Sequence, residues 1–337
     1  MSSSSRSGRH RRGHPAEAET KWFERKVLGT ATKQIRDTLD YLQTVQIIPV
    51  TNQRGHTFEL HSQSVSRILK LVLYKPSDLL PEECRRVRHY ISSTAGFIHV
   101  LPWEDYQGVC GILLTPAELE EYFGFREQVI RRASNQAVPP GETGLLGQFL
   151  SGHLDEAPSE EFQVYLQWLQ HDPGDFKPEP LLRNLGEKIE RSDGPEGERG
   201  YYRILSEFAK LRRNELKQAT IRFSTCLEAV QKGEFYEPTR FLSVENDCGF
   251  IFIAVPPEMV RQRVNGLKNF TLLSKYGTKL TRHVGVSFAK EGSEYLIDWM
   301  LVEYPWEYEP ELEEALRRSD TFRPMKAVEF PRYNFEI

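Results

Sequence analysis

The sequence has few cysteines and no long hydrophobic run. Its four cysteines include no C-x-x-C pair of the kind that zinc or redox chemistry favours, and we interpret them as reduced, mostly buried thiols. No apolar run approaches the roughly 20 residues that span a bilayer, and residues 1–20 lack the hydrophobic segment of a signal peptide. We therefore expect a soluble cytoplasmic protein with no membrane partner.

Common catalytic signatures are also missing. The chain has no G-x-x-x-x-G-K-S/T loop, no G-x-G-x-x-G, no H-E-x-x-H and no G-x-S-x-G. His56, His61, His89 and His99 have no matching Asp or Cys cluster for metal binding. Asp298 interrupts an apolar run, where either a metal site or a solvated carboxylate would fit. We assign no catalytic residue, no metal ligand and no cofactor.

Neither sign of charge dominates the composition. Lys and Arg number 44 and Asp and Glu 48, which gives a net charge of -4. This balance argues against a protein whose whole surface coats nucleic acid, although a local basic patch would fit. Residues 1–20 combine serines with four arginines and have little to bury, so we expect a disordered basic tail. Such a tail either contacts nucleic acid or is simply solvated.

The first half predicts a mixed sheet with helices. Apolar positions recur every three or four residues over 21–43, which indicates an amphipathic helix. Apolar runs at 47–50, 67–74 and 96–101 predict strands, and a polar helix is expected over 81–92. The run at 67–74 is nearly continuous, as expected of a strand covered on both faces. Thr115, followed by Pro116 and Glu118, predicts the capped start of a helix that runs to about residue 132.

The second half predicts helices followed by two hairpins. Short helices are expected at 145–150 and 162–169, a Pro-rich connector at 173–180 and one long helix over 201–232. Strands at 240–244 and 249–255 flank a turn, and those at 283–289 and 294–303 flank another, with helices at 257–273 and 309–318. The order indicates an α+β layer with one sheet face covered.

These patterns predict an α+β protein with several regions. We expect a disordered basic tail at 1–20, a mixed α/β domain at 21–150 and a helical connector at 151–198. An α+β domain follows at 199–325, and a C-terminal tail at 326–337.

The predicted long helix has a basic face. Its cations are Arg203, Lys210, Arg212, Arg213 and Lys217, interleaved with apolar residues. The face would either lie against phosphates, as a nucleic-acid-binding surface, or be an ordinary solvated helix surface. Separately, the aromatic residues Trp299, Tyr304, Trp306 and Tyr308 either belong to the core or form a partner surface.

Several stretches stand out together: W-F-E-R from Trp22 with Q-I-R at 34–36 and Y-L at 41–42, G-F-I-H-V-L at 96–101, and residues 114–127. These stretches resemble the C-terminal portion of a large family of bacterial proteins whose N-terminal part looks like a PD-(D/E)XK nuclease core. In that family a similar G-F-h-H-V-h strand precedes a T-x-x-D/E helix, much as Thr115 does here. The likeness covers residues 21–150 and extends more thinly to Glu303.

The resemblance implies that the metal-binding aspartate and the carboxylate–lysine pair would lie before Trp22, where this chain has only the tail. Glu24 and Lys26 match the E-x-K half of the motif. They fall on a predicted helix, where residues two apart face different ways, so we reject them as catalytic. Either the reading frame starts upstream, or this member keeps only the accessory part.

Three hypotheses follow. The first is a non-catalytic, nuclease-related bacterial protein that binds nucleic acid or a protein partner, in a mobile-element or defence context. The second is a metal-dependent DNA endonuclease whose core lies upstream of the numbered chain. The third is a structural or interaction protein.

Overall fold

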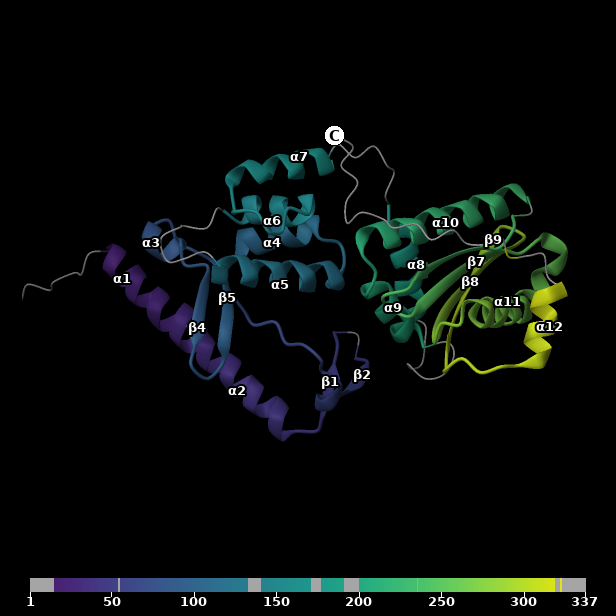
Figure 1. Cartoon of the computed structure of the whole chain (residues 1–337), viewed down its shortest axis with the longest axis horizontal. Helices are drawn as coiled ribbons and strands as arrows, with labels where there is room; N and C mark the ends of the chain where they lie inside the picture. Colours follow the sequence, from purple (N-terminus) through teal and green to yellow (C-terminus); the bar gives the residue numbers. More distant parts are fainter. Residues whose placement is uncertain are drawn as a thin grey trace, which may run out of the picture. The chain divides into compact units, whose positions relative to one another are not determined.

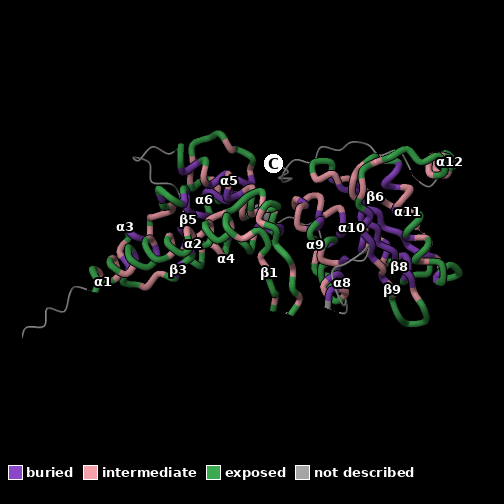
Figure 2. The backbone as a smooth tube through the Cα atoms, turned by 90° about the horizontal axis from the view of Figure 1, so that it is seen from below, coloured by how far each residue is buried: buried purple, intermediate pink, exposed green. Residues whose placement is uncertain are grey.

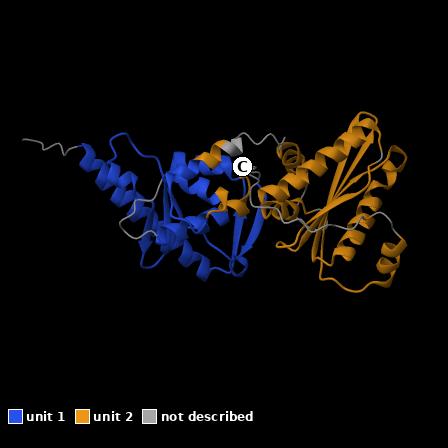
Figure 3. Ribbon diagram, turned by 45° about the horizontal axis from the view of Figure 1, so that its top comes forward, with its two compact units in different colours: residues 1–113, 120–149, 154–163 blue, residues 114–119, 150–153, 164–337 orange. Residues whose placement is uncertain are grey.

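The computed structural model describes residues 15–53, 55–132, 141–170, 177–190, 200–234, 236–318 and 322. The chain divides into two compact units, shown in Figure 3. Unit 1 comprises residues 1–113, 120–149 and 154–163, and unit 2 comprises residues 114–119, 150–153 and 164–337. Helices and strands are mixed in each unit, which confirms the α+β class. Among the described residues, no helix is long and apolar enough to cross a bilayer.

The first described residues form three consecutive helical segments, α1 (Pro15–Trp22), the π-helix η1 (Phe23–Thr30) and α2 (Ala31–Thr44). The predicted helix over 21–43 is confirmed, but it starts earlier than expected. Of the expected disordered tail, residues 1–14 lie outside the described part and residues 15–20 are helical. The Glu19 carboxylate accepts a hydrogen bond from Ser77 Oγ at 2.6 Å, which links α1 to the rest of unit 1.

The sheet of unit 1 has three short strands. β3 (Leu71–Tyr74) pairs in parallel with β5 (Gly96–Pro102), and β4 (His89–Ser92) pairs with β5 in the antiparallel sense, which gives the order β3-β5-β4. The prediction of a helix over 81–92 was wrong beyond the short α3 (Glu82–Arg85). The turn before Gly96, whose φ is +70°, folds residues 89–92 back onto β5 as a strand.

A separate hairpin follows α2. It consists of β1 (Ile47–Thr51) and β2 (Thr57–His61), and η2 (Ser62–Ser64) comes directly after it. None of its ten strand residues is buried, and Figure 2 shows β1 as an exposed segment.

Helices follow β5 in close succession. They are α4 (Trp103–Ile112), α5 (Pro116–Arg132), α6 (Glu142–Ser151), η3 (Glu160–Gln163) and α7 (Val164–Gln170). The Glu118 N–H donates to Thr115 Oγ1 at 3.2 Å, which confirms the predicted cap. The Glu118 side chain accepts the N–H of Leu114 at 2.8 Å. The sequence patterns did not predict α4.

Unit 2 contains a four-stranded sheet with the order β6-β7-β8-β9. Its strands are β6 (Thr239–Ser243), β7 (Cys248–Ala254), β8 (Arg282–Glu291) and β9 (Glu294–Glu303). Both predicted hairpins are confirmed, and β7 and β8 join them in parallel. The connection from β7 to β8 contains η4 (Pro257–Gln262) and α11 (Arg263–Thr278), and α12 (Pro310–Arg318) follows β9 (Figure 1).

Both faces of this sheet are covered, whereas the sequence predicted cover on one face. Phe250 and Phe252 pack in a cluster that contains Phe223 of α10 (Arg213–Lys232), and Ile251 packs on the opposite face in a cluster with Leu267 of α11. Every residue of β7 is buried, as expected of a strand with helices on both sides.

The predicted helix over 201–232 is two helices, α9 (Tyr201–Ala209) and α10. The chain breaks at 210–212, where the Arg212 N–H donates to the Glu215 carboxylate at 2.9 Å and starts a new capped helix. α8 (Glu179–Glu190) lies in the expected connector, yet its Leu181 and Leu185 are buried in the core of unit 2. The expected C-terminal tail, 326–337, lies outside the described residues.

Candidate functional site

The five cations of the predicted basic face lie on α9, α10 and the break between them. Four have acidic neighbours. Arg203 contacts Glu303, Lys210 Nζ lies 2.6 Å from Glu207, Arg212 lies 2.8 Å from Glu245, and Arg213 lies 3.9 Å from Glu118. Lys217 is half-buried.

Some of these cations belong to one ionic chain. Arg282 of β8 lies 3.2 Å from Glu207 and 4.0 Å from Glu303, so these two carboxylates are shared with Lys210 and Arg203. A phosphate would have to compete with carboxylates that already neutralise much of this charge. Nucleic-acid binding by the five residues therefore stays a prediction.

The other residues noted in the sequence have structural partners. Asp298 Oδ2 accepts from Arg263 Nε at 2.9 Å, which accounts for a carboxylate within an apolar strand. Trp299 is buried, and Trp306 Nε1 donates to the Tyr276 carbonyl at 3.1 Å, whereas Tyr308 is exposed. Three of the four cysteines are buried, as expected, and Cys110 is exposed. In the described part of the chain, no group of three or more His, Cys, Asp or Glu side chains could hold a metal ion.

A fully buried ion pair lies in unit 1. Arg126 donates to both carboxylate oxygens of Glu142, at 2.8 and 3.1 Å, and the Tyr122 hydroxyl donates to one of them. Arg126 Nη1 also donates to His99 Nδ1 at 3.0 Å. Burial, and secondarily the Arg126 charge, lowers the pKa of His99 to about 3. Because these groups satisfy one another, we interpret the cluster as structural.

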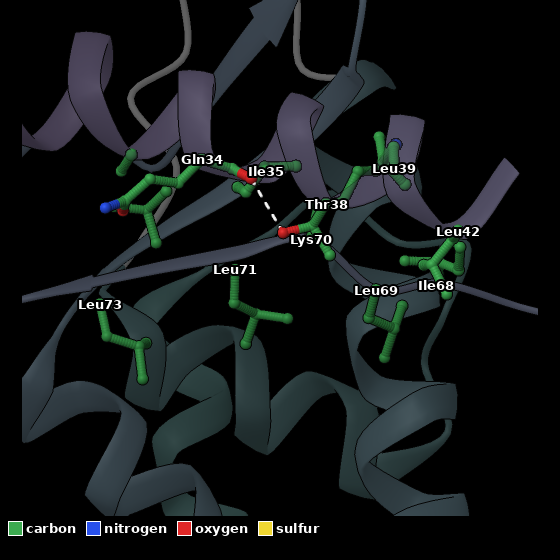
Figure 4. Close-up of a pocket in the computed structure, with 12 residues that line it drawn as sticks. Gln34, Ile35, Thr38, Leu39, Leu42, Ile68, Leu69, Lys70, Leu71 and Leu73 are labelled. Atoms are coloured by element: carbon green, nitrogen blue, oxygen red, sulfur yellow. Dashed lines mark hydrogen bonds between the residues drawn. The ribbon is translucent and has the colours of Figure 1, made fainter. Parts of the chain in front are cut away.

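A groove of about 370 Å³ runs between α2 and residues 68–73 in unit 1 (Figure 4). Its lining is mostly aliphatic, and Lys70 is the one charged side chain among the lining residues. The volume lies near the lower end of the ~300–1,000 Å³ range typical of ligand pockets. The lining residues are Ala31, Gln34, Ile35, Thr38, Leu39, Leu42 and residues 68–73.

α2 forms one wall of the groove. Ile35 and Leu39 pack partly against the core of unit 1, but α2 has no buried residue. Thr38 is exposed, and its hydroxyl donates to the Gln34 carbonyl at 2.9 Å (Figure 4). Ile35 and Leu39 therefore contact the core and also line the groove, because the core covers them only in part.

The opposite wall is an edge strand. β3 pairs only with β5 among the described strands, and the His99 N–H donates to the Lys70 carbonyl at 2.8 Å. Hydrogen-bonding groups alternate sides along a strand, so the N–H and C=O of Leu71 and Leu73 point toward the free edge. Leu73 and Ile68 are also exposed. This edge therefore has both apolar side chains and unpaired backbone groups.

The β1–β2 hairpin is rooted at one end of the groove. The Ser62 N–H donates to the Gln46 carbonyl at 2.9 Å, next to the chain segments that carry Leu42 and Ile68. Ile48 pairs with Leu60 and Val50 with Phe58, so four apolar side chains share one face. An isolated two-stranded hairpin is marginally stable in water, which makes an uncovered apolar face costly.

Exposed apolar residues are frequent in the segment that carries the groove. Of the eighteen large hydrophobic residues that are exposed in the described structure, nine lie between residues 41 and 91; Ile68 and Leu73 line the groove, whereas Tyr90 and Ile91 lie on β4, across β5 from β3. Scattered apolar residues are normal on a protein surface, but a local excess indicates an interaction site. The candidate site is therefore the groove with the free edge of β3.

Sequence reasoning missed this site. Residues 67–74 were predicted to be a strand covered on both faces, because their apolar run is nearly continuous. Cover on the faces does not reveal whether an edge is paired. The usable signal was the set of cations that flanks the run, Arg67, Lys70 and Lys75, because charged residues are typical of edge strands.

No protein-family model matches the sequence, and neither the curated proteins nor the solved structures include a significantly similar protein. The resemblance to the nuclease-associated family therefore stays a prediction.

Proposed function

We propose that this protein is a non-catalytic binding protein that binds a partner protein through the groove of unit 1. The observation that carries this proposal is the groove itself, whose apolar walls end at an unpaired strand edge. Burying apolar surface is the main favourable term in most protein association. The cations of α9 and α10 favour a nucleic-acid partner less, because most of them have carboxylates beside them.

Site-specific photo-crosslinking in the cells that make this chain would test the proposal. A photoreactive residue is placed at Ile68 or at Leu73, both exposed at the groove, and at Val244, which is exposed in unit 2. We expect the same partner protein to be crosslinked from both groove positions and not from position 244. The purified partner should then bind the purified chain.

A matched pair of variants tests whether the groove is the binding surface. Thr38 and Thr44 are both exposed on α2, and both hydroxyls donate to the carbonyl four residues earlier. Only Thr38 lines the groove. Thr38→Trp should fill the groove and weaken partner binding at least tenfold, whereas Thr44→Trp should leave it unchanged. Equal effects of the two substitutions would contradict the proposal.

The nucleic-acid alternative has its own test. Fluorescence anisotropy with labelled 20-nucleotide DNA and RNA, at 50 and 200 mM salt, would reveal electrostatic binding by its salt dependence. Binding that Lys217→Glu and Arg212→Glu weaken, together with the absence of any crosslinked protein from the groove, would replace the protein-partner proposal.

A further inference from the structure

The free edge of β3 has the geometry to accept another strand. Lys70 bonds to β5 through its carbonyl, which leaves the N–H and C=O of Leu71 and Leu73 facing away from the sheet. An extended peptide at this edge would pair with these backbone groups and gain main-chain hydrogen bonds. Such pairing does not depend on the peptide's side chains.

The groove lies along the same edge, on the side of α2. In Figure 4, Leu69, Leu71 and Leu73 point away from α2, whereas Ile68 lies beside Leu42 of that helix. Successive side chains of an added strand alternate between its two faces. One set would therefore enter the groove against Ile35 and Leu39, and the other set would lie beside Leu71 and Leu73. This arrangement selects a peptide with apolar residues at alternate positions.

Charge around the edge specifies the ends of that peptide. Residues 60–77 contain Arg67, Lys70 and Lys75 but no Asp or Glu. Arg67 lies 3.1 Å from Glu120, and Lys70 Nζ donates to the Ala95 carbonyl at 2.6 Å, while Lys75 is exposed. Acidic residues flanking the apolar positions would complement Lys75 directly and would compete with Glu120 for Arg67.

The same charges argue against a second copy of this chain as the occupant. Two β3 edges paired about a two-fold axis would bring Lys70 and Lys75 of both copies to the ends of one short pairing, although the two lysines face opposite sides of the strand. Like charges across neighbouring strands are destabilising, and lysines on edge strands commonly prevent self-pairing.

We propose that the free edge of β3 binds an extended segment of a partner protein, apolar at alternate positions and acidic at its ends, as an added fourth strand. This inference rests on the proposed function and specifies the partner's chemistry. It makes the groove a site of strand addition, not a site for a helix or for a folded surface.

The test begins with a displayed library of random nine-residue peptides, screened against the full chain. We expect enriched peptides to carry apolar residues two apart, with Asp or Glu at the ends. One enriched peptide is then synthesised with a fluorescent label, and its Kd is measured by anisotropy.

Two substitutions at one position separate backbone pairing from side-chain contact. Leu73→Pro removes the outward N–H, which the ladder to β5 does not use, and Leu73→Ala removes the side chain but keeps the N–H. We expect Leu73→Pro to weaken peptide binding about tenfold or more, because it removes a main-chain hydrogen bond and disturbs the pairing of the two strands. Leu73→Ala should weaken binding about threefold, because it removes only a side-chain contact. Lys75→Glu at the exposed flank should weaken binding about threefold, and exchanging the peptide's acidic ends for lysines should restore it.

Amide hydrogen exchange gives a readout specific to strand addition. The N–H groups of Leu71 and Leu73 should exchange quickly in the free chain and slowly with the peptide, whereas the Val72 N–H should be protected in both. Failure to enrich any peptide, or unchanged binding by Leu73→Pro, would overturn the inference. If the chain forms a dimer and Leu73→Pro dissociates that dimer, the inference is also overturned, in favour of pairing between two β3 edges.

The outcomes also separate this inference from the proposed function. If groove positions crosslink a partner protein but the Leu71 and Leu73 amides stay unprotected in that complex, the binding function stands and strand addition is wrong. If no partner is crosslinked and no peptide binds, both the proposed function and the strand-addition inference are wrong.

Discussion

β7 in unit 2 and β3 in unit 1 are both apolar strands, but their surroundings differ. β7 has neighbours on both edges and helices on both faces, and all seven of its residues are buried. β3 has a neighbour on one edge, and Leu73 is exposed. Similar strand sequences therefore complete a core in one unit and leave an open edge in the other. The comparison indicates that β7 is fully covered in unit 2 and that β3 is covered only in part in unit 1.

The largest expected effect is at the centre of the unit 2 core. Trp299 is 1% exposed, packs against Phe208 and Phe223, and donates through Nε1 to Asn184 at 2.9 Å. Trp299→Ala should lower the free energy of unfolding by about 3–5 kcal/mol in urea denaturation. Trp299→Phe, which keeps an aromatic ring, should cost less than half as much. A loss below about 1 kcal/mol for the alanine variant would show that this core is looser than the structure indicates.

Unit 1 should show a comparable cost at its buried ion pair. Arg126→Met leaves the Glu142 carboxylate buried without its cation and should destabilise the protein by about 3 kcal/mol or more. The double variant Arg126→Met with Glu142→Leu removes both charges and should recover part of that loss. If the double variant were the less stable of the two in urea denaturation, the uncompensated charge would not be the cause.

A smaller effect is expected where β7 and β8 approach closely. The α-carbon of Gly249 lies against the His283 ring, and a Cβ there would overlap the ring. Gly249→Ala should cost about 1–3 kcal/mol of unfolding free energy through overpacking. In a His283→Ala background the same substitution should cost much less, because the overlapping ring is gone. An undiminished cost in that background would mean that strand geometry, not the histidine, requires glycine.

His283 should also make the stability of unit 2 depend on pH. Burial is the main cause that lowers its pKa to about 3, and Ser274 Oγ lies 2.8 Å from Nε2. Between pH 6.5 and about 3 the unfolded state binds a proton that the folded state does not. The free energy of unfolding therefore falls as the pH falls through this window, with a slope of about 1.4 kcal/mol per pH unit from this residue.

The His283→Gln variant isolates this contribution. Its stability should depend less steeply on pH than that of the parent chain between pH 6 and 4, because it lacks the imidazole. Carboxylates such as Asp247 titrate in both chains and leave part of the pH dependence in each. Identical slopes in urea denaturation at a series of pH values would exclude His283 as the source.

The smallest effect is expected on the hairpin of unit 1. Val50 is exposed, and its neighbours on the apolar face are not buried either. Val50→Ser should change the unfolding free energy by less than about 0.5 kcal/mol. A loss of several kcal/mol would show that the hairpin is part of a core after all, which would remove one contrast between the units.

Much of unit 2 could be predicted from local pattern. The runs that became β7, β8 and β9 are apolar and bounded by turn residues, and the Thr115 cap needs only a few neighbouring residues. The break between α9 and α10 was not predicted, because the apolar period continues through Leu211. The break is stabilised by the Glu215 side chain, which accepts the Arg212 N–H at the start of α10.

The candidate site could not be predicted from local pattern, because it depends on which strand lies at the edge. β4 is four residues long and was expected to be helix, so the order β3-β5-β4 was not foreseen. Some of the carboxylates beside the basic face were equally hidden, although Glu207 is only three residues from Lys210. Glu303 lies 100 residues from Arg203 along the chain, and only the fold brings them together.

The π-helix η1 fixes the rotational phase of α2. η1 contains the buried Phe23 and Val27 and leads directly into α2, which forms the groove wall, and the Thr30 hydroxyl donates to the Arg25 carbonyl at 3.0 Å. Each residue of a helix turns the chain by about 100°, so deleting one residue from η1 would rotate Gln34 and Thr38 away from β3 while the helix stayed intact. The number of residues between 23 and 30 is therefore constrained more tightly than the identity of those residues. The strands of the β1–β2 hairpin have no buried residue among those described, so the length of the chain there is less constrained.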